Sequence, residues 1–140
     1  MTIQHQTHLS FTSSGRGLME ITEEVRNWLS TCQVNKGLLT LFVQHTSASL
    51  VIQENADPDV LHDLEMFFKK LVPDTISLYR HSSEGSDDMP AHIRSALTQV
   101  QLSIPVLQGR MQLGTWQGIY LYEHRTRPHR RKICAHFIGD

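Results

Sequence analysis

The spacing of apolar positions along the chain predicts two amphipathic helices. Residues 23–34 carry apolar side chains at the spacing of one helical face, and Thr22 stands where an N-cap belongs. A second stripe follows Asp57 and Pro58, a favourable helix start, and Pro73 stops it. The two stripes consist of Val25, Trp28, Leu29 and Cys32, and of Val60, Leu64, Phe67, Phe68 and Leu71.

Strand patterns occupy the beginning and the last third of the chain. Residues 3–12 alternate polar and apolar side chains, whereas 38–43 is the short continuous apolar run of a buried strand. A short helix is predicted to begin at Pro90, with Ile93, Leu97 and Val100 facing inward. Four further strands are predicted at 102–107, 111–113, 115–123 and 133–138. In the last of these strands, Ile133, Ala135 and Phe137 share one face. Helices and strands do not alternate regularly. The pattern therefore predicts a single α+β domain over residues 1–140, with a mixed or antiparallel sheet and helices packed on one side.

The composition is that of an ordinary globular domain and argues against several classes of function. The formal net charge of −1 gives no electrostatic footprint for nucleic acid. No apolar run approaches the roughly 20 residues that span a bilayer, and the N-terminal residues lack the basic and apolar regions of a signal peptide. Cys32 and Cys134 are far apart and have no C-x-x-C partner, which favours reduced thiols in a cytoplasmic protein.

Nine histidines are the one unusual count, and the segment from His81 to His92 combines two of them with three acidic residues. Ser, Gly, Asp and Pro dominate this segment, which predicts a loop. Imidazole nitrogens and carboxylate oxygens bind divalent metals, and a carboxylate can also fix a histidine tautomer. We therefore take His81, Asp87, Asp88 and His92 as candidate site residues. The alternative is a solvated acidic loop in which Asp88 caps the third helix.

Two further segments place polar groups beside predicted elements. His45-Thr46-Ser47 follows the buried strand, where His45 suits a metal ligand or a base and the two hydroxyls suit a phosphate. The alternative is a strand end around a hydrogen-bonded core histidine. Glu54 and Asn55 come just before the second predicted helix and suit a pocket wall, although the capping aspartate beside them needs no function.

The last third of the chain contributes an aromatic segment and a basic one. Trp116 and Gln117 stand between two glycines, which predicts a bulge or a close backbone approach and suits either a pocket wall or a core tryptophan. Residues 125–132 form the only basic cluster, in which Arg130 and Arg131 suit a phosphate or diphosphate. A solvated turn is the alternative for this cluster.

Five segments together carry a family resemblance: His45-Thr-Ser-Ala-Ser-Leu50, Glu54-Asn-Ala-Asp-Pro-Asp-Val60, His81 with Asp87-Asp88-Met-Pro-Ala-His92, Ser103-Ile-Pro-Val-Leu-Gln-Gly109, and Leu113-Gly-Thr-Trp-Gln-Gly-Ile-Tyr-Leu-Tyr-Glu-His124. Over nearly the whole chain they resemble the YjbQ-like family, also called the secondary thiamine-phosphate synthase family. The resemblance implies a compact α+β domain that assembles as a homotrimer, with its polar site near a subunit interface. It also implies a weak or secondary synthesis of thiamine phosphate. In that reaction a thiazole phosphate displaces diphosphate from a hydroxymethylpyrimidine diphosphate.

On the matching positions the resemblance implies roles for particular residues. The catalytic candidates are His45, His81, Asp87 and His92. A divalent metal, zinc or magnesium, would be held by His45, His81 and His92. A small phosphorylated metabolite would be bound by Thr46, Ser47, Glu54, Asn55, Trp116, Gln117, Arg130 and Arg131. Two other functions fit the same residues: a metal-dependent hydrolase of a small phosphorylated metabolite, and a non-enzymatic trimeric module that binds a metabolite or a metal.

Overall fold

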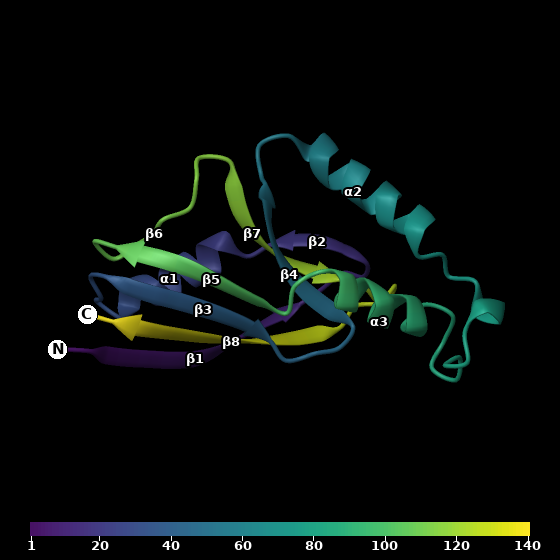
Figure 1. The fold of residues 1–140 in the computed structure, drawn as a ribbon, viewed down its shortest axis with the longest axis horizontal. Coiled ribbons are helices and arrows are strands. Elements are labelled where there is room, and N and C mark those ends of the chain that lie inside the picture. The colour runs from purple at the N-terminus through teal and green to yellow at the C-terminus, as the bar shows by residue number, and fades with distance from the viewer.

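Two antiparallel sheets and three α-helices make up the protein in a computed structural model that describes all 140 residues (Figure 1). In chain order the elements are β1 (Ile3–Thr12), β2 (Gly17–Glu20), α1 (Thr22–Thr31), β3 (Gly37–Val43), β4 (Ala48–Glu54), α2 (Pro58–Leu71), the 3-10 turn η1 (Ile76–Leu78), α3 (Asp88–Leu97), β5 (Gln101–Leu107), β6 (Arg110–Met111), β7 (Gln117–Glu123) and β8 (Arg130–Gly139). The predicted α+β class is confirmed. Two strands, β2 and β4, were not predicted. None of the helices combines the length and apolar composition needed to cross a membrane.

The strand order places the two chain ends together, away from α3. One sheet has the order β1-β8-β3-β5-β6 and the other β2-β7-β4. All pairings are antiparallel, and β1 pairs with β8 from Ile3 opposite Gly139 to Thr12 opposite Arg130. Both termini therefore lie at one end of the molecule, and α3 lies toward the other (Figure 1).

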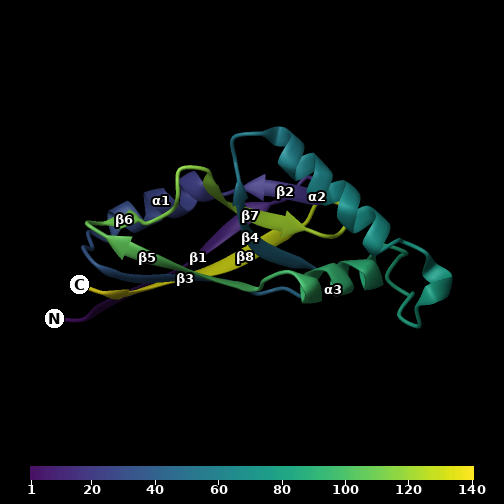
Figure 2. The same cartoon turned by 45° about the horizontal axis from the view of Figure 1, so that its top comes forward.

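The core fills the space between α1 and the inner faces of the two sheets (Figure 2). The alternation predicted for the last strand is confirmed, because Ile133, Ala135 and Phe137 are fully buried. Val25 and Leu29 of α1 pack into the same cluster. Each of the larger side chains, Val, Leu, Ile or Phe, contributes about 1.5–3 kcal/mol when it leaves water, so the inner strand positions and one face of α1 hold the domain together.

The helix starts differ from the sequence prediction in two places. Ile21, not Thr22, is the N-cap residue of α1; the Thr22 hydroxyl instead accepts a hydrogen bond from the Ile119 amide at 2.9 Å and ties the helix to β7. The third helix begins at Asp88 rather than at Pro90, and the residue before it, Asp87, makes no side-chain cap. The alternative interpretation of Asp88 as an N-cap was therefore wrong.

The inward face predicted for α3 was also wrong. Leu97 and Val100 are exposed, whereas Ala91, Arg94 and Ser95 are buried. The Ser95 hydroxyl donates to the Ala48 carbonyl at 3.1 Å, so α3 packs on β4 through a partly polar face. Sequence periodicity counted only apolar residues and missed that face.

Helix α2 follows its predicted boundaries but packs loosely on its own chain. The Asp57 side chain accepts from the Asp59 amide at 2.9 Å, as predicted for the cap. None of its residues is buried, and the apolar stripe ends in exposed Phe67 and Leu71. The helix crosses the molecule diagonally from the end of β4 (Figure 2). Phe68 is its main aromatic contact, edge-on to the ring of Tyr122 in β7.

A buried ion pair joins β7 to β8. Arg131 donates through Nε at 2.8 Å to Oε1 of Glu123 and through Nη2 to Oε2. The same carboxylate accepts from the Ser13 hydroxyl at 2.7 Å and from the Arg125 amide at 3.1 Å. Burial raises the pKa of Glu123, but the hydrogen bonds from Arg131 and Ser13 outweigh it and hold the pKa below its usual value. The pair therefore stays charged and fixes the turn that follows β7.

Breaking this pair from one side should destabilise the fold strongly. Glu123→Gln leaves the buried guanidinium of Arg131 without its counter-charge, and we expect a loss of about 3–5 kcal/mol in the free energy of unfolding. Urea denaturation measures it. Arg130→Gln, the exposed neighbour in the same strand, is the control and should change stability by less than about 0.5 kcal/mol. Equal effects of the two substitutions would contradict the structural role given to the pair.

His124 is buried in its neutral form at the end of β7. Its Nε2 lies 2.8 Å from the Ser49 hydroxyl, and its ring packs on Tyr122 at 4.4 Å between centroids. Burial, reinforced by the charge of Arg94, lowers the pKa of His124 to about 3. The unfolded chain binds a proton at this residue near pH 6.5, whereas the folded chain does not until about pH 3.

Stability should therefore fall as the pH drops from about 6.5 toward 3, and the contribution of His124 is fully present only above pH 6.5. The slope from this residue approaches about 1.4 kcal/mol per pH unit in that window. Urea unfolding of wild type and His124→Gln between pH 7 and 4.5 isolates the effect, because other titrating groups are common to both. We expect a flatter profile in the variant; parallel profiles would show that His124 is not held neutral.

Candidate metal centre

Three metal-binding side chains meet where the loop before α3 joins the helix. Ligand atoms of His81, Asp88 and His92 all lie within 4.8 Å of one another. Asp88 Oδ2 is 2.5 Å from His81 Nε2 and 3.3 Å from His92 Nε2. Asp88 and His92 are one helical turn apart, so α3 presents them on the same face, while His81 reaches them from the loop.

The hydrogen bonds around His92 leave its Nε2 free to coordinate. His92 Nδ1 lies 3.0 Å from the Thr46 carbonyl oxygen. A carbonyl can only accept, so Nδ1 carries a proton, and Nε2, which faces Asp88, is the nitrogen that remains to coordinate a metal. Thr46 therefore acts through its backbone to orient the histidine.

Arg125 holds both aspartates of the loop. Its Nη1 is 2.9 Å from Asp88 Oδ1, and its Nε is 2.9 Å from Asp87 Oδ2. Asp87 also accepts from the Thr126 amide and hydroxyl. Burial raises the pKa of Asp87, but the hydrogen bonds from Arg125 and Thr126 outweigh it and lower the pKa to about 2. Asp87 thus anchors the loop, and Asp88 remains an ionised ligand with Oδ2 turned to the histidines.

Two imidazoles and one carboxylate suit zinc better than magnesium. Zinc takes nitrogen and oxygen ligands together, whereas magnesium prefers oxygen alone. A structural zinc site is normally closed by four protein ligands, but this group offers three, and the side chains of His81 and His92 are 40% and 32% exposed. The donor set therefore fits a metal with an open coordination position. Without an ion, the same groups form a hydrogen-bonded histidine–aspartate cluster.

Two depressions adjoin the cluster. One, of about 520 Å³, has no hydrophobic residue on its walls and is formed beside the cluster by Asp87 and Arg125, with the acidic Glu84 and the basic Arg127 and His129. The other is a shallow hollow of about 260 Å³ that shares His92 and has a partly apolar wall. A charged group and a less polar one therefore have separate places beside the three ligand side chains.

His45 lies beside this centre without joining the ligand group. It lines the shallow hollow with His92, but its Nε2 accepts from the Lys132 amide at 2.8 Å. Burial and the charge of Arg131 lower the pKa of His45. The three-ligand group contains Asp88 where we predicted His45.

The predicted phosphate binders divide between buried and exposed positions. Arg131 is engaged with Glu123 and donates through Nη2 to the Ser47 hydroxyl at 3.0 Å, so it supports the loop that carries His45 and Thr46. Arg130 is exposed at the start of β8.

The other predicted binding residues gather at the far end of the β4–β7 ladder. Glu54 pairs with Gln117, and the Asn55 amide donates to the Trp116 carbonyl at 2.9 Å. The opposite end of this ladder, Ala48 with Glu123, leads to the metal-binding cluster. Six residue steps of about 3.3 Å separate the two ends by roughly 20 Å. The single chain therefore does not bring this group to the histidines.

At Gly118, one of the two glycines beside Trp116, side chains rather than another backbone segment pack closely. A Cβ at Gly118 would lie 2.7 Å from the Glu20 carboxylate and 3.0 Å from the Asn55 side chain. Trp116, in contrast, is 61% exposed and is not a core residue.

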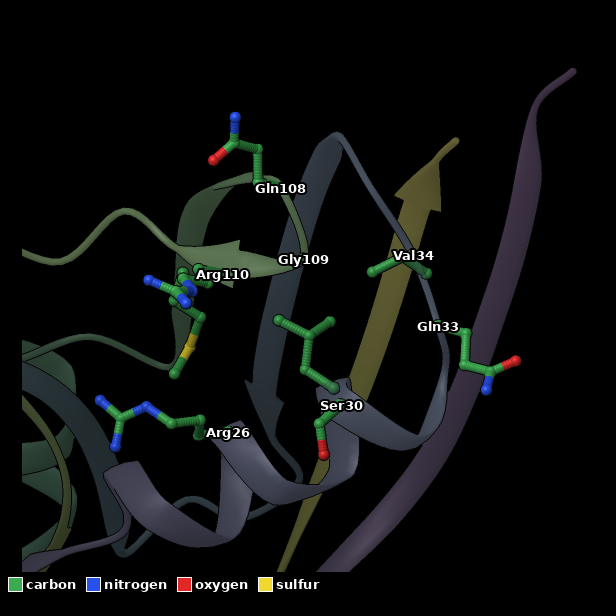
Figure 3. A pocket seen from close by; sticks show the side chains of 9 residues that line it. Arg26, Ser30, Gln33, Val34, Gln108, Gly109 and Arg110 are labelled. Atoms are coloured by element: carbon green, nitrogen blue, oxygen red, sulfur yellow. The ribbon is translucent and has the colours of Figure 1, made fainter.

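The largest cavity of the molecule lies elsewhere. It has a volume of about 650 Å³ and is formed by α1 and the β5–β6 hairpin, with Arg26, Ser30 and Arg110 on its walls (Figure 3). No histidine or acidic residue lines it. By volume alone this cavity would be the first candidate for a binding site. The metal-binding and basic side chains, however, favour the smaller depressions beside the cluster.

The sequence could not distinguish Asp88 from Asp87 as the ligand, and it could not single out Arg125. Asp87 and Asp88 are neighbours of the same type, and only the start of α3 decides which one shares a face with His92. Arg125 appeared only as one member of a basic cluster, because the contact with the loop joins residues 38 positions apart.

The fold and the cluster define a class: a small antiparallel α+β domain with a two-histidine, one-carboxylate group at a loop–helix junction. The family described as UPF0047 protein YjbQ-like matches residues 7–140, and the chain belongs to this family. It is similar to UPF0047 protein sll1880 of Synechocystis sp., with 53% identity over 98% of this chain and 93% of that protein. It is also similar to UPF0047 protein YjbQ of Escherichia coli O157:H7, with 47% identity over 97% of this chain and 99% of that protein. The predicted family is confirmed.

A solved structure supports the same fold. A protein of the YjbQ/UPF0047 family from Clostridium acetobutylicum has a TM-score of 0.84 and 32% identity, covering 94% of this chain and 98% of that one.

Metal analysis tests the cluster directly. We expect purified protein dialysed against zinc to retain about one ion per chain, and His81→Ala, His92→Ala and Asp88→Asn each to lose it. Arg125→Gln leaves the ligands in place but removes the group that orients Asp88, so zinc affinity should drop about 10–100-fold. His62→Ala, on the exposed surface of α2, is the matched control and should retain the metal. Zinc retention in all three ligand variants would show that the cluster is a hydrogen-bonded group and not the metal site.

Proposed function

We propose that this protein is a metal-dependent transferase that joins a hydroxymethylpyrimidine diphosphate to a thiazole phosphate and releases diphosphate. The observation that carries the proposal is the His81–Asp88–His92 group with a separate depression on each of two flanks. The family resemblance suggests the identity of the substrates, and the two separate depressions beside the metal-binding group are consistent with two substrates. As in the sequence prediction, the activity is taken to be weak or secondary.

The chemistry is a displacement at carbon. The thiazole nitrogen forms a bond to the methylene carbon of the pyrimidine, the bond from that carbon to the diphosphate oxygen breaks, and the electron pair leaves with diphosphate. Such a reaction needs positive charge where the leaving group develops negative charge. A bound divalent metal would supply Lewis acidity there.

The residues of this chain have distinct tasks in the proposal. Arg127 and His129 line the polar depression and bind the diphosphate by charge-assisted hydrogen bonds, while Arg125 on the same wall is engaged with Asp87 and Asp88. Val100 and Ala96 give the shallow hollow an apolar wall for a heteroaromatic ring, with His45 and His92 beside it. Asp87 needs no proton transfer; it keeps Arg125 in place.

A homotrimer in the cytoplasm belongs to the same proposal. Apolar side chains stand exposed on α2 and on the turn after it, where a second copy of the chain would cover them: Met66, Phe67, Leu71, Ile76 and Leu78. The far group with Trp116 would then also meet another subunit, in keeping with a site near an interface. The two free cysteines fit a reducing compartment.

A metal-dependent hydrolase is the second candidate, because His81 and His92 are open to water. An assay with both co-substrates separates the two. We expect zinc-loaded protein to form thiamine phosphate and diphosphate in equal amounts, and to release neither phosphate nor diphosphate from one substrate alone. Release from a single substrate, without condensation, would replace the transferase with the hydrolase.

Two substitutions test the residue roles in that assay. His92→Ala should lower kcat/KM by about 10³-fold, which corresponds to about 4 kcal/mol of transition-state stabilisation. Arg127→Gln should raise the KM for the diphosphate about tenfold and leave the metal bound. Arg110→Gln, an arginine of the unrelated cavity in Figure 3, is the control. If Arg127→Gln and Arg110→Gln behave alike, the polar depression does not bind the diphosphate.

A further inference from the structure

A small cavity of about 200 Å³ lies between α2 and the body of the domain, apart from the metal centre. Its walls are Arg16, Glu65, Met66, Lys69 and Arg94. It shares no residue with either depression beside the histidines. Glu65, Met66 and Lys69 come from α2, and Arg94 comes from α3.

Arg94 is a buried cation with unused donors. The residue is 1% exposed, and its Nη2 donates to the Val72 carbonyl at 3.1 Å, at the end of α2. Its Nε and Nη1 are buried and have no hydrogen-bond partner. A guanidinium that is removed from water normally uses its fork of donors on a carboxylate or a phosphate. Arg94 lines the cavity with that fork incompletely occupied.

The other charges around the cavity leave an excess of positive charge. Arg16 is already paired with Asp74, with both guanidinium nitrogens donating to the carboxylate. Counting Asp74, three basic residues face two acidic ones, and Lys69 provides the third ammonium or guanidinium group. An anion in the cavity would balance this excess.

One acceptor sits among these donors. Glu65 Oε1 is buried without a hydrogen-bond partner, as is the hydroxyl of Tyr122. Burial raises the pKa of Tyr122, and the nearby Glu65 raises it further, so the hydroxyl stays protonated and is itself a donor that this carboxylate can accept from. The carboxylate has more lone pairs than one hydroxyl can serve, so a ligand that mostly accepts hydrogen bonds but also donates one toward Glu65 fits the lining.

We propose that this cavity binds inorganic phosphate in its protonated form, with its unprotonated oxygens on Arg94 and Lys69 and its P–OH group donating to Glu65. Hydrogen phosphate keeps at least one P–OH at neutral pH. Sulfate has the same shape but no proton to donate, so it would face the Glu65 carboxylate with lone pairs only. The cavity is therefore selective for phosphate over sulfate. This site is independent of the metal centre and of the reaction proposed there.

Calorimetric titration with sodium phosphate and with sodium sulfate, at constant ionic strength and pH 7.5, tests the proposal. We expect phosphate to bind wild type at least tenfold more tightly than sulfate. Lys69→Gln should weaken phosphate binding at least fivefold, whereas Lys70→Gln, the next residue on the same helix, should change it less than twofold. These two variants have the same net charge and both substitute exposed positions of α2.

Glu65→Gln tests the role of the acceptor, because an amide can both donate and accept. It should reduce the preference for phosphate over sulfate to about twofold or less by strengthening sulfate binding. His92→Ala and Arg127→Gln should leave the Lys69-dependent phosphate binding unchanged, which separates this site from the metal centre. Equal binding of phosphate and sulfate to wild type, or equal effects of Lys69→Gln and Lys70→Gln, would overturn the proposal and leave ordered water as the occupant.

Discussion

The buried pair of Glu123 and Arg131 is the interaction on which the rest of the structure depends. The carboxylate of Glu123 accepts hydrogen bonds from Ser13, from Arg131 and from the Arg125 amide, and so joins the end of β1 to β8 and to the turn after β7. Arg131 extends the network to Ser47. A buried charge pair tolerates little displacement, because any loosening exposes an uncompensated charge to a low-dielectric interior. The turn after β7 is therefore held in one position.

That turn determines the geometry of the candidate metal centre. Its first residue after His124 is Arg125, whose guanidinium grips Asp87 and Asp88 from the opposite side of the loop. On the other flank, the Ser47 loop presents the Thr46 carbonyl that fixes the tautomer of His92. The ligand side chains are thus oriented by groups that all lead back to the same ion pair. Such a supporting shell is what gives a site its precision, more than the ligands themselves.

Helix α2 gives the molecule a second, looser part. It has no buried residue and is connected to the domain mainly through Phe68 on Tyr122 and through Arg94 at its end. Four of the five buried side-chain polar atoms without a partner belong to Arg94, Glu65 and Tyr122 in this region, and the fifth is Nδ1 of His124, whose ring packs on Tyr122. This region therefore depends on a partner that the chain alone does not provide. Both the exposed apolar stripe of α2 and the cavity beneath the helix are surfaces that the chain leaves without a partner.

The sequence by itself determined the elements whose signal is local. Alternation predicted the strands at both ends of the chain, the capping aspartate predicted the start of α2, and residue types alone singled out the loop with His81 and His92. Local signals failed for α3, where a buried arginine and serine replaced the expected apolar face. Only the tertiary structure decided that Asp88 rather than Asp87 contacts the histidines, and that Arg125 holds both aspartates. It also decided that Trp116 lies about 20 Å from this cluster, at the other end of the β4–β7 ladder. The reason is physical. The periodicity of a sequence shows which face of a helix or strand avoids water. A site, in contrast, is made by charges and hydrogen bonds between elements, and which side chains meet is decided only when the sheets and helices pack together.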